Sequence, residues 1–265
     1  MSYLKNHEIK IHYEIAGSGE PLILIQGLGE SLEWWEWQFR YFEDKMKVVR
    51  YDNRGVGLSE RPEKPYTMDQ LVNDLHQLII SLNLKKKVNL CGYSMGGMIA
   101  QNYVHQYPKD INSLILIATS AFIRTDFLIE NIKKLENLDK INRVWADFAI
   151  LFTKPFRDHL RENKELLDKL INYRTKNPTR LVDYENQAHA INNFHDTRKL
   201  LKFIKKPVLL LGAKKDKIIP LSLMKDLHEK LPNSELKIID QAGHGLIIEA
   251  AKELNTLIWQ FLQQI

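Results

Sequence analysis

One stretch, residues 88–100, constrains the fold of this chain more than any other. It begins with the apolar run Val88-Asn89-Leu90-Cys91, continues through Gly92-Tyr93-Ser94-Met95-Gly96, and ends in apolar residues at helical spacing. Glycines two positions before and after Ser94 indicate a turn so sharp that side chains there would collide with neighbouring chain. The stretch predicts a buried strand, a tight turn with a serine at its apex, and a helix.

Further apolar runs place this stretch in a larger sheet. Continuous apolar runs are typical of strands covered on both faces; they occur at residues 21–25, 48–51, 114–118 and 208–211, with candidate strands also at 8–15 and 236–239. Apolar residues at helical spacing occur at 71–82, 98–104, 223–231 and 254–262. Because buried strands alternate with amphipathic helices, the sequence predicts an α/β fold with a mostly parallel, doubly wound sheet.

The alternation stops between residues 122 and 200, where only helical patterns occur. Candidate helices span residues 128–138, 141–152, 156–173 and 179–191. A block of helices between two sheet strands is expected to cap the carboxyl edge of the sheet, where open α/β sheets bind ligands. We therefore expect a core domain made of residues 1–121 and 201–265, with an all-helical cap (lid) at 122–200 inserted in it.

Composition and charge argue against several classes of function. The net charge of +5 comes from dispersed lysines, and the longest run, Lys85-Lys86-Lys87, lacks a basic stripe with interleaved aromatic residues. We therefore expect no nucleic-acid partner. The single cysteine, Cys91, allows neither an intramolecular disulfide nor a cysteine metal cluster. No dinucleotide-binding glycine pattern or metal-ligand spacing occurs, so we expect no cofactor and no metal.

The N-terminus gives no sign of a targeting segment. It lacks an apolar signal region, and no apolar run in the chain approaches the length of a membrane span. These features predict a cytoplasmic protein that has no membrane partner.

Ser94 is a candidate nucleophile. G-x-S-x-G at a strand-to-helix turn exposes a reactive serine, and the N-terminus of the following helix favours negative charge beside it. A serine nucleophile needs a histidine base and a carboxylate that orients this base. Of the nine histidines, His244 stands on a turn between glycines after the last strand, and two carboxylates, Asp216 and Asp240, follow late strands.

Taken in order, these motifs resemble the α/β-hydrolase fold family with a helical cap, over essentially the whole chain. They are most similar to small carboxylesterases of bacteria and archaea and to 3-oxoadipate enol-lactonase-like hydrolases. Gln26-Gly27-Leu28-Gly29 stands where the family commonly carries His-Gly-x-Gly, and Asp52 to Ser59 resembles its D-x-R-G-x-G-x-S segment. The resemblance implies an oxyanion hole made by the backbone N–H groups of Leu28 and Met95. The Asp52 segment we interpret as a structural loop.

The resemblance also selects the acid. The family position matches Asp216 rather than Asp240, which gives the chain order Ser94, Asp216, His244 expected for this fold. Gln26 departs from the usual histidine. Because the oxyanion donor is a backbone N–H group, the hole is expected to survive this change.

Aromatic residues near the expected site favour an apolar substrate pocket. Trp34 and Trp35 follow the Gln26 loop, whereas Phe122, Trp145 and Phe148 belong to the cap or its stem. As a group they favour a small hydrophobic acyl or aromatic substrate. Each of them alone is equally compatible with the core of the cap.

The sequence predicts a serine hydrolase, a carboxylesterase that cleaves small, largely apolar esters or lactones through an acyl-enzyme. Enol-lactonases, C–C bond hydrolases and cofactor-free perhydrolases share this triad, so they remain alternatives. Serine at position 94 disfavours the haloalkane dehalogenases and epoxide hydrolases of this fold, which use a carboxylate nucleophile. The alternative outside enzymes is a small-molecule receptor or regulator, which would expose an apolar cap surface at Trp145 or Phe148. We expect a monomer or homodimer.

Overall fold

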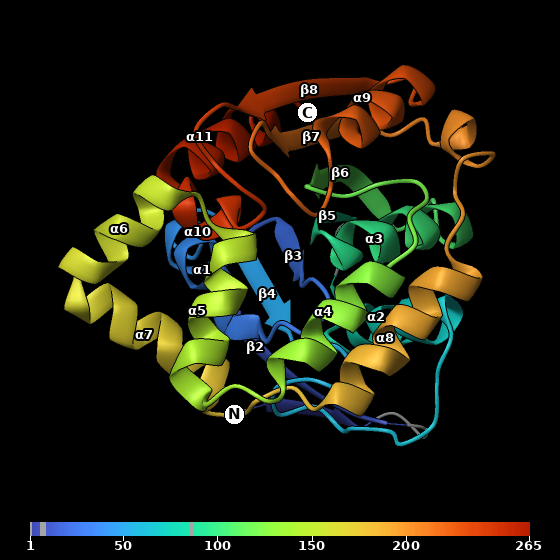
Figure 1. The fold of residues 1–265 in the computed structure, drawn as a ribbon. Coiled ribbons are helices and arrows are strands. Elements are labelled where there is room, and N and C mark those ends of the chain that lie inside the picture. Colours follow the sequence, from blue (N-terminus) through green and yellow to red (C-terminus); the bar gives the residue numbers. More distant parts are fainter. Residues whose placement is uncertain (1, 6–8, 85–86) are drawn as a thin grey trace.

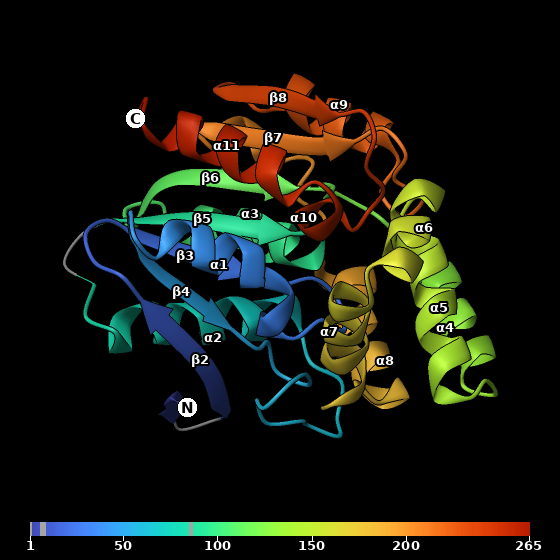
Figure 2. The same cartoon turned by 90° about the vertical axis from the view of Figure 1, so that its left-hand side faces the viewer.

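An eight-stranded sheet runs through the computed structural model, which describes residues 2–5, 9–84 and 87–265 (Figures 1 and 2). The strand order is β1-β2-β4-β3-β5-β6-β7-β8. The strands are β1 (Ser2–Lys5), β2 (Lys10–Ala16), β3 (Pro21–Ile25), β4 (Lys47–Tyr51), β5 (Val88–Tyr93), β6 (Ile111–Ile117), β7 (Val208–Ala213) and β8 (Ser234–Ile239). β1 with β2 and β2 with β4 pair antiparallel, and the other neighbours pair parallel. The predicted α/β class with a mostly parallel sheet is confirmed.

Helices cover both faces of the sheet. The helices outside the 122–200 insertion are α1 (Glu36–Phe42), α2 (Met68–Ser81), α3 (Met95–Gln106), α9 (Leu221–Lys230), α10 (Leu246–Glu249) and α11 (Ala251–Leu262), with short 3₁₀ turns η1 (Leu32–Trp35) and η2 (Leu201–Phe203). α2, α3 and α9 pack on one face, and α1, α10 and α11 on the other (Figure 2). Side chains of a strand alternate between faces, so Leu90 of β5 joins one core and Cys91 the other. A strand that helices cover on both faces of the sheet must be apolar along its whole length, which explains the continuous apolar runs in the sequence.

The insertion consists of helices in the order expected. They are α4 (Asp126–Leu135), α5 (Lys140–Leu151), α6 (Lys154–Glu162), α7 (Lys164–Thr175) and α8 (Leu181–Phe194). Figure 2 shows them beside the ends toward which the arrowheads of β5, β6 and β7 point. None of the helices in the described part of the chain combines the length and apolar character needed to cross a membrane.

One predicted helix, residues 156–173, is wrong, because the chain forms two helices there. Asn163 leaves helical geometry, with φ −109° and ψ 85°, and separates α6 from α7. Its side chain accepts a hydrogen bond from the Leu166 N–H at 3.1 Å and so caps the start of α7. Asparagine is favoured at such caps because its side chain replaces a missing backbone partner. Apolar residues keep their helical spacing on both sides of Asn163, so the sequence pattern gives no sign of the break.

The N-terminal region also differs from the sequence prediction. β1 (Ser2–Lys5) is an edge strand that no periodic pattern indicated, and the predicted strand at 8–15 lies at Lys10–Ala16. Glu8 of that prediction lies outside the described residues, as do Lys85 and Lys86 of the lysine run.

The loop from Asp52 to Ser59 has a structural role. The Asp52 carboxylate accepts hydrogen bonds from the Leu32 N–H at 2.7 Å and the Leu58 N–H at 2.9 Å. It also lies 2.8 Å from Nδ1 of His12 on β2. The Ser59 hydroxyl donates to the Asp52 carbonyl at 2.7 Å. One buried carboxylate thereby ties β2, the end of β4 and the start of η1 together beneath the site.

Candidate active site

Ser94 lies at the apex of the sharp turn between β5 and α3. Its backbone has φ 52° and ψ −117°, a region that residues other than glycine rarely adopt. A Cβ atom at Gly92 would overlap the backbone of Gly96, and one at Gly96 would overlap the backbone of Ile25. The glycine spacing is therefore steric, as the sequence predicted. The Ser94 carbonyl accepts a hydrogen bond from the Thr119 hydroxyl at 2.7 Å, which helps to hold the turn.

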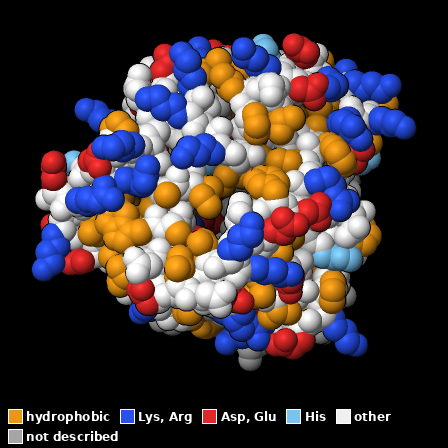
Figure 3. All heavy atoms as spheres, in the orientation of Figure 1, with side chains coloured by type: hydrophobic (Ala, Val, Ile, Leu, Met, Phe, Trp, Pro, Cys, Tyr) orange, Lys and Arg blue, Asp and Glu red, His pale blue; other side chains and the backbone are white. Residues whose placement is uncertain are grey.

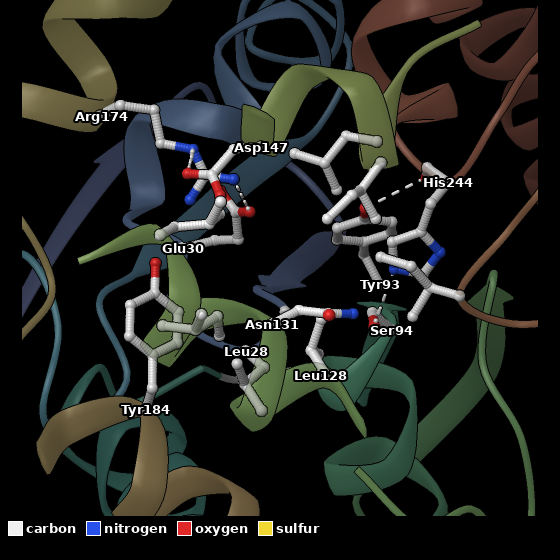
Figure 4. Close-up of a pocket in the computed structure, with 16 residues that line it drawn as sticks. Leu28, Glu30, Tyr93, Ser94, Leu128, Asn131, Asp147, Arg174, Tyr184 and His244 are labelled. Atoms are coloured by element: carbon white, nitrogen blue, oxygen red, sulfur yellow. Dashed lines mark hydrogen bonds and ion pairs between the residues drawn. The ribbon is translucent and has the colours of Figure 1, made fainter. Parts of the chain in front are cut away.

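The structure brings Ser94, His244 and Asp216 into one hydrogen-bonded chain. Ser94 Oγ lies 3.1 Å from Nε2 of His244, and Nδ1 of His244 lies 2.8 Å from Oδ2 of Asp216. The side chains of His244 and Asp216 are 4% and 1% exposed, respectively, so water does not compete for the contact between them. Figure 4 shows the imidazole of His244 directed at Ser94.

Loop hydrogen bonds hold the carboxylate and the imidazole in place. Oδ1 of Asp216 accepts from the N–H groups of Ile218 and Ile219, both at 2.8 Å. The Tyr93 hydroxyl donates to the carbonyl of His244 at 3.1 Å (Figure 4). Asp240, the rival carboxylate in the sequence, instead forms an exposed ion pair with Lys214 at 3.7 Å.

Gln26 braces the loop that follows β3. Its side-chain oxygen accepts from the Gly27 N–H at 2.8 Å, and its amide donates to the Ser31 carbonyl at 3.3 Å. The Gln26 carbonyl accepts from the Asn53 amide at 3.0 Å. One amide group therefore spans this loop. The N–H groups of Leu28 and Met95 donate no hydrogen bond to protein atoms of the described residues, which leaves both available to a ligand.

Helices of the insertion hold the same loop from the other side. The Gly29 N–H donates to Oε1 of Gln187 at 2.7 Å, and the Gly29 carbonyl accepts from the Thr179 hydroxyl at 2.8 Å. Gly29 has φ +73°, and a Cβ atom there would overlap the ring of Tyr184. The position of the Leu28 N–H group thus depends on residues about 150 positions away, which the sequence did not indicate.

A cavity of about 70 Å³ opens between Ser94 and the insertion helices. On the face that carries these helices, hydrophobic side chains gather around a central hollow (Figure 3). Leucine and isoleucine side chains supply most of the apolar lining: Leu28, Leu128, Ile132, Leu135, Ile150, Leu151 and Ile218. A second, smaller lobe beside Ser94 is lined by apolar residues that include Met98, Ile123 and Ile191.

The five aromatic residues expected to line the substrate pocket do not line this cavity. Trp35 is fully buried against Tyr93, and Phe148 is fully buried between Trp145 and Phe152. Flat rings of this size fill the seam between sheet and insertion, where close packing is needed.

The other three expected aromatic residues have cationic neighbours. Trp145 is half-buried beneath Arg161, and Phe122 lies under Arg198 near the surface. Trp34 lines a neighbouring cavity beneath Arg174.

Charged residues that the sequence analysis missed form one end of the cavity at Ser94. Arg174 of α7 donates to Oε1 of Glu30 at 2.8 Å, and its Nε lies 4.0 Å from Oδ2 of Asp147. Burial raises the pKa of Glu30 to about 7; Arg174 opposes this shift and Asp147 adds to it. Burial likewise raises the pKa of Asp147. A charged residue directly after a glycine-rich loop was the only signal in the sequence.

No group of three or more metal-ligating side chains could hold an ion within residues 2–5, 9–84 and 87–265. Ser94, His244 and Asp216 lie together at this site, with the N–H groups of Leu28 and Met95 beside them. A hydroxyl activated by an imidazole beside two free backbone donors can attack a carbonyl carbon and stabilise the oxyanion that results.

Comparisons with known proteins give consistent matches. The family model described as alpha/beta hydrolase fold matches residues 20–251. The AB hydrolase superfamily protein YisY of Bacillus subtilis (strain 168) is 29% identical over 272 residues, covering 98% of each chain. The enol-lactonase from Burkholderia xenovorans LB400 has a TM-score of 0.88 at 25% identity, covering 99% of this chain and 100% of that one. A thermophilic esterase from Thermogutta terrifontis has a TM-score of 0.83 at 25% identity, covering 97% and 94%.

Proposed function

The chain belongs to the α/β-hydrolase fold family, and from this premise we propose that it is a serine hydrolase that cleaves carboxylic esters of small, largely apolar substrates. The observation that carries this proposal is the hydrogen-bonded chain from Ser94 through His244 to Asp216, with 3.1 Å and 2.8 Å between the paired atoms. This is the geometry that a nucleophile, a general base and an orienting acid require.

In the proposed reaction, Ser94 is the nucleophile. Because the Asp216 carboxylate can only accept, it holds the proton on Nδ1 of His244 and leaves the Nε2 lone pair facing Ser94. Nε2 accepts the Ser94 proton while Oγ attacks the ester carbonyl. The oxyanion that forms is stabilised by the N–H groups of Leu28 and Met95.

His244 then acts as a general acid. It protonates the leaving alcohol, and an acyl group remains on Ser94. It next accepts a proton from water, which attacks the acyl carbonyl, and then returns that proton to Ser94 Oγ as the bond to the acyl group breaks and the acid is released. The buried contact between His244 and Asp216 supports this role, because it stabilises the imidazolium formed in both steps.

The lining of the cavity supports a substrate with apolar groups on either side of the ester. The main cavity and the smaller lobe at Met98 both open beside Ser94. We infer that residues 122–200 act as a cap, because α4 and α5 supply much of the lining, and that 1–121 with 201–265 form the core domain.

Hydrolysis of a lactone is the second candidate function. It requires the same groups, and the likeness to an enol-lactonase favours it. The receptor alternative predicted an exposed apolar patch at Trp145 or Phe148. Phe148 is fully buried, and Trp145 is half-buried under Arg161.

The test is hydrolysis of p-nitrophenyl esters from acetate to palmitate, with a lactone and a C–C substrate in parallel. We expect a preference for short acyl chains and a loss of at least about 10⁴-fold in kcat for Ser94→Ala. Ser222→Ala, an exposed serine on α9, is the matched control and should keep full activity. Full activity of Ser94→Ala would contradict the proposal, and a preference for long chains would contradict the compact pocket.

A further inference from the structure

The end of the cavity remote from Ser94 has polar chemistry that the proposed reaction does not use. Glu30, Asp147 and Arg174 lie together there, and Tyr184 directs its hydroxyl toward them (Figure 4). Ser94 and His244 lie on the opposite side of the view, where Asn131 and Leu128 are also labelled (Figure 4). A substrate that reacts at Ser94 can therefore extend toward a distinct polar group.

Glu30 has an acceptor atom without a partner. Its Oε1 accepts from Arg174 at 2.8 Å, whereas its Oε2 is buried and has no hydrogen bond within the described residues. The Glu30 side chain is 6% exposed, so water does not readily supply the missing partner. A buried carboxylate oxygen without a donor is destabilising, so a ligand that donates to it is favoured.

The guanidinium of Arg174 lies beside both carboxylates, and its buried Nε–H has no hydrogen-bond partner within the described residues. Arg174 is shared between Glu30 and Asp147, and its guanidinium lies over the ring of Trp34 at 4.4 Å. Arg143 of α5 lines the neighbouring cavity on the far side of Asp147. Two guanidinium groups around the carboxylates disfavour a further cation, because like charges repel at close range.

A neutral donor fits these groups best. A hydroxyl can donate to Oε2 of Glu30 and can also accept from a donor of the same cavity wall, the Nε–H of Arg174 or the hydroxyl of Tyr184. We propose that this end of the cavity, the Glu30 subsite, binds a hydroxyl group of the substrate, at a position remote from the bond that is cleaved. This inference rests on the proposed ester hydrolysis and specifies its substrates as hydroxylated esters.

The first test is a comparison of matched esters. Wild-type protein is assayed with p-nitrophenyl esters of ω-hydroxy acids of six to ten carbons, each against the unsubstituted acid of the same length. Hexanoate esters of alkanediols and alkanols test the alcohol side. At pH 8, where Glu30 is ionised, we expect at least one hydroxylated ester to have about 10-fold higher kcat/KM than its partner, as one hydrogen bond to a charged group provides.

In Glu30→Met, the ratio of kcat/KM for the hydroxylated ester to kcat/KM for the unsubstituted ester is expected to be about one. Glu30→Gln keeps a neutral acceptor oxygen and is expected to give an intermediate ratio. Glu229→Met, an exposed glutamate on α9, is the matched control and should keep the wild-type ratio. Circular dichroism verifies that each variant folds, and Glu30→Gln serves if Glu30→Met does not. A wild-type ratio of one in both series, or an unchanged ratio in both Glu30 variants, would overturn the proposal.

A binding measurement separates the subsite from the proposed reaction. Methyl 6-hydroxyhexanoate and methyl hexanoate are titrated into Ser94→Ala protein and observed by NMR. Tighter binding of the hydroxylated ester, lost when Glu30→Met is added, supports the subsite even if no ester is turned over. Equal binding of the two esters overturns it even if esters are hydrolysed rapidly.

Discussion

Replacing Glu30 by glutamine should change how the stability of this protein depends on pH. Burial raises the pKa of Glu30 from its ordinary 4.5 to about 7 in the folded state; Arg174 lowers it, while Asp147 raises it and His244 lowers it to a smaller extent. The folded chain therefore holds this proton more tightly than the unfolded chain. The stabilisation from Glu30 is complete below about pH 4.5 and is lost as pH rises through about 7.

The size of the effect follows from the two pKa values. Each pH unit between them is worth about 1.4 kcal/mol, so the free energy of unfolding contributed by Glu30 falls by about 3 kcal/mol across this range. Little of this is lost to solvent screening, because the side chain is 6% exposed. Glutamine does not titrate, so the free energy of unfolding of Glu30→Gln lacks this pH-dependent contribution.

Urea unfolding followed by tryptophan fluorescence at pH 5, 6, 7 and 8 measures this difference. The free energy of unfolding of the wild type, minus that of Glu30→Gln, should fall by about 2.5 kcal/mol from pH 5 to pH 8. Glu229→Gln, at an exposed site on α9, should give a flat difference. If the Glu30→Gln difference is also flat or rises with pH, Glu30 is ionised in the folded state throughout, and the reasoning from burial is refuted.

Three further predictions concern the candidate site. Asp216→Asn should lower kcat for ester hydrolysis about 10³- to 10⁴-fold with the fold intact, because an amide can hold His244 in the wrong tautomer; a pH–rate profile and circular dichroism check this. Gly96→Ala should destabilise the protein by about 3 kcal/mol or more in a urea titration, because its Cβ atom would overlap the backbone of Ile25. Cys91 should not react with a thiol reagent until the chain unfolds, because burial raises the pKa of its thiol; rapid labelling of native protein would contradict this.

Much of the core and of the reacting groups could be predicted from local sequence. Strands covered on both faces must be apolar at every position, so residues 21–25 and 208–211 were recognisable without a structure. The turn at Ser94 requires glycine on either side for reasons confined to a few residues and the adjacent β3. The choice of Asp216 over Asp240 came from the resemblance to a known family and not from local sequence, and the structure places Asp216 beside His244.

Two predictions that rested on helical periodicity were wrong. The break at Asn163 is a local geometric choice that helical periodicity does not register. The expected pocket aromatics failed for a different reason. An apolar side chain in a helix can face the core or a cavity, and its periodicity is the same in both cases.

The sequence by itself determined the strand–helix alternation and the turn that presents Ser94, because these follow from steric limits and periodicity over a few residues. Tertiary structure alone decided what surrounds the serine. It joined Gly29 to Gln187 and Glu30 to Arg174, across 158 and 144 positions of the chain, respectively. The energy of such a pair depends on burial and on the position of the partner, which no single segment specifies. Ser94 could therefore be recognised from the residues next to it in the sequence, whereas the residues that line its cavity could be identified only from the tertiary structure.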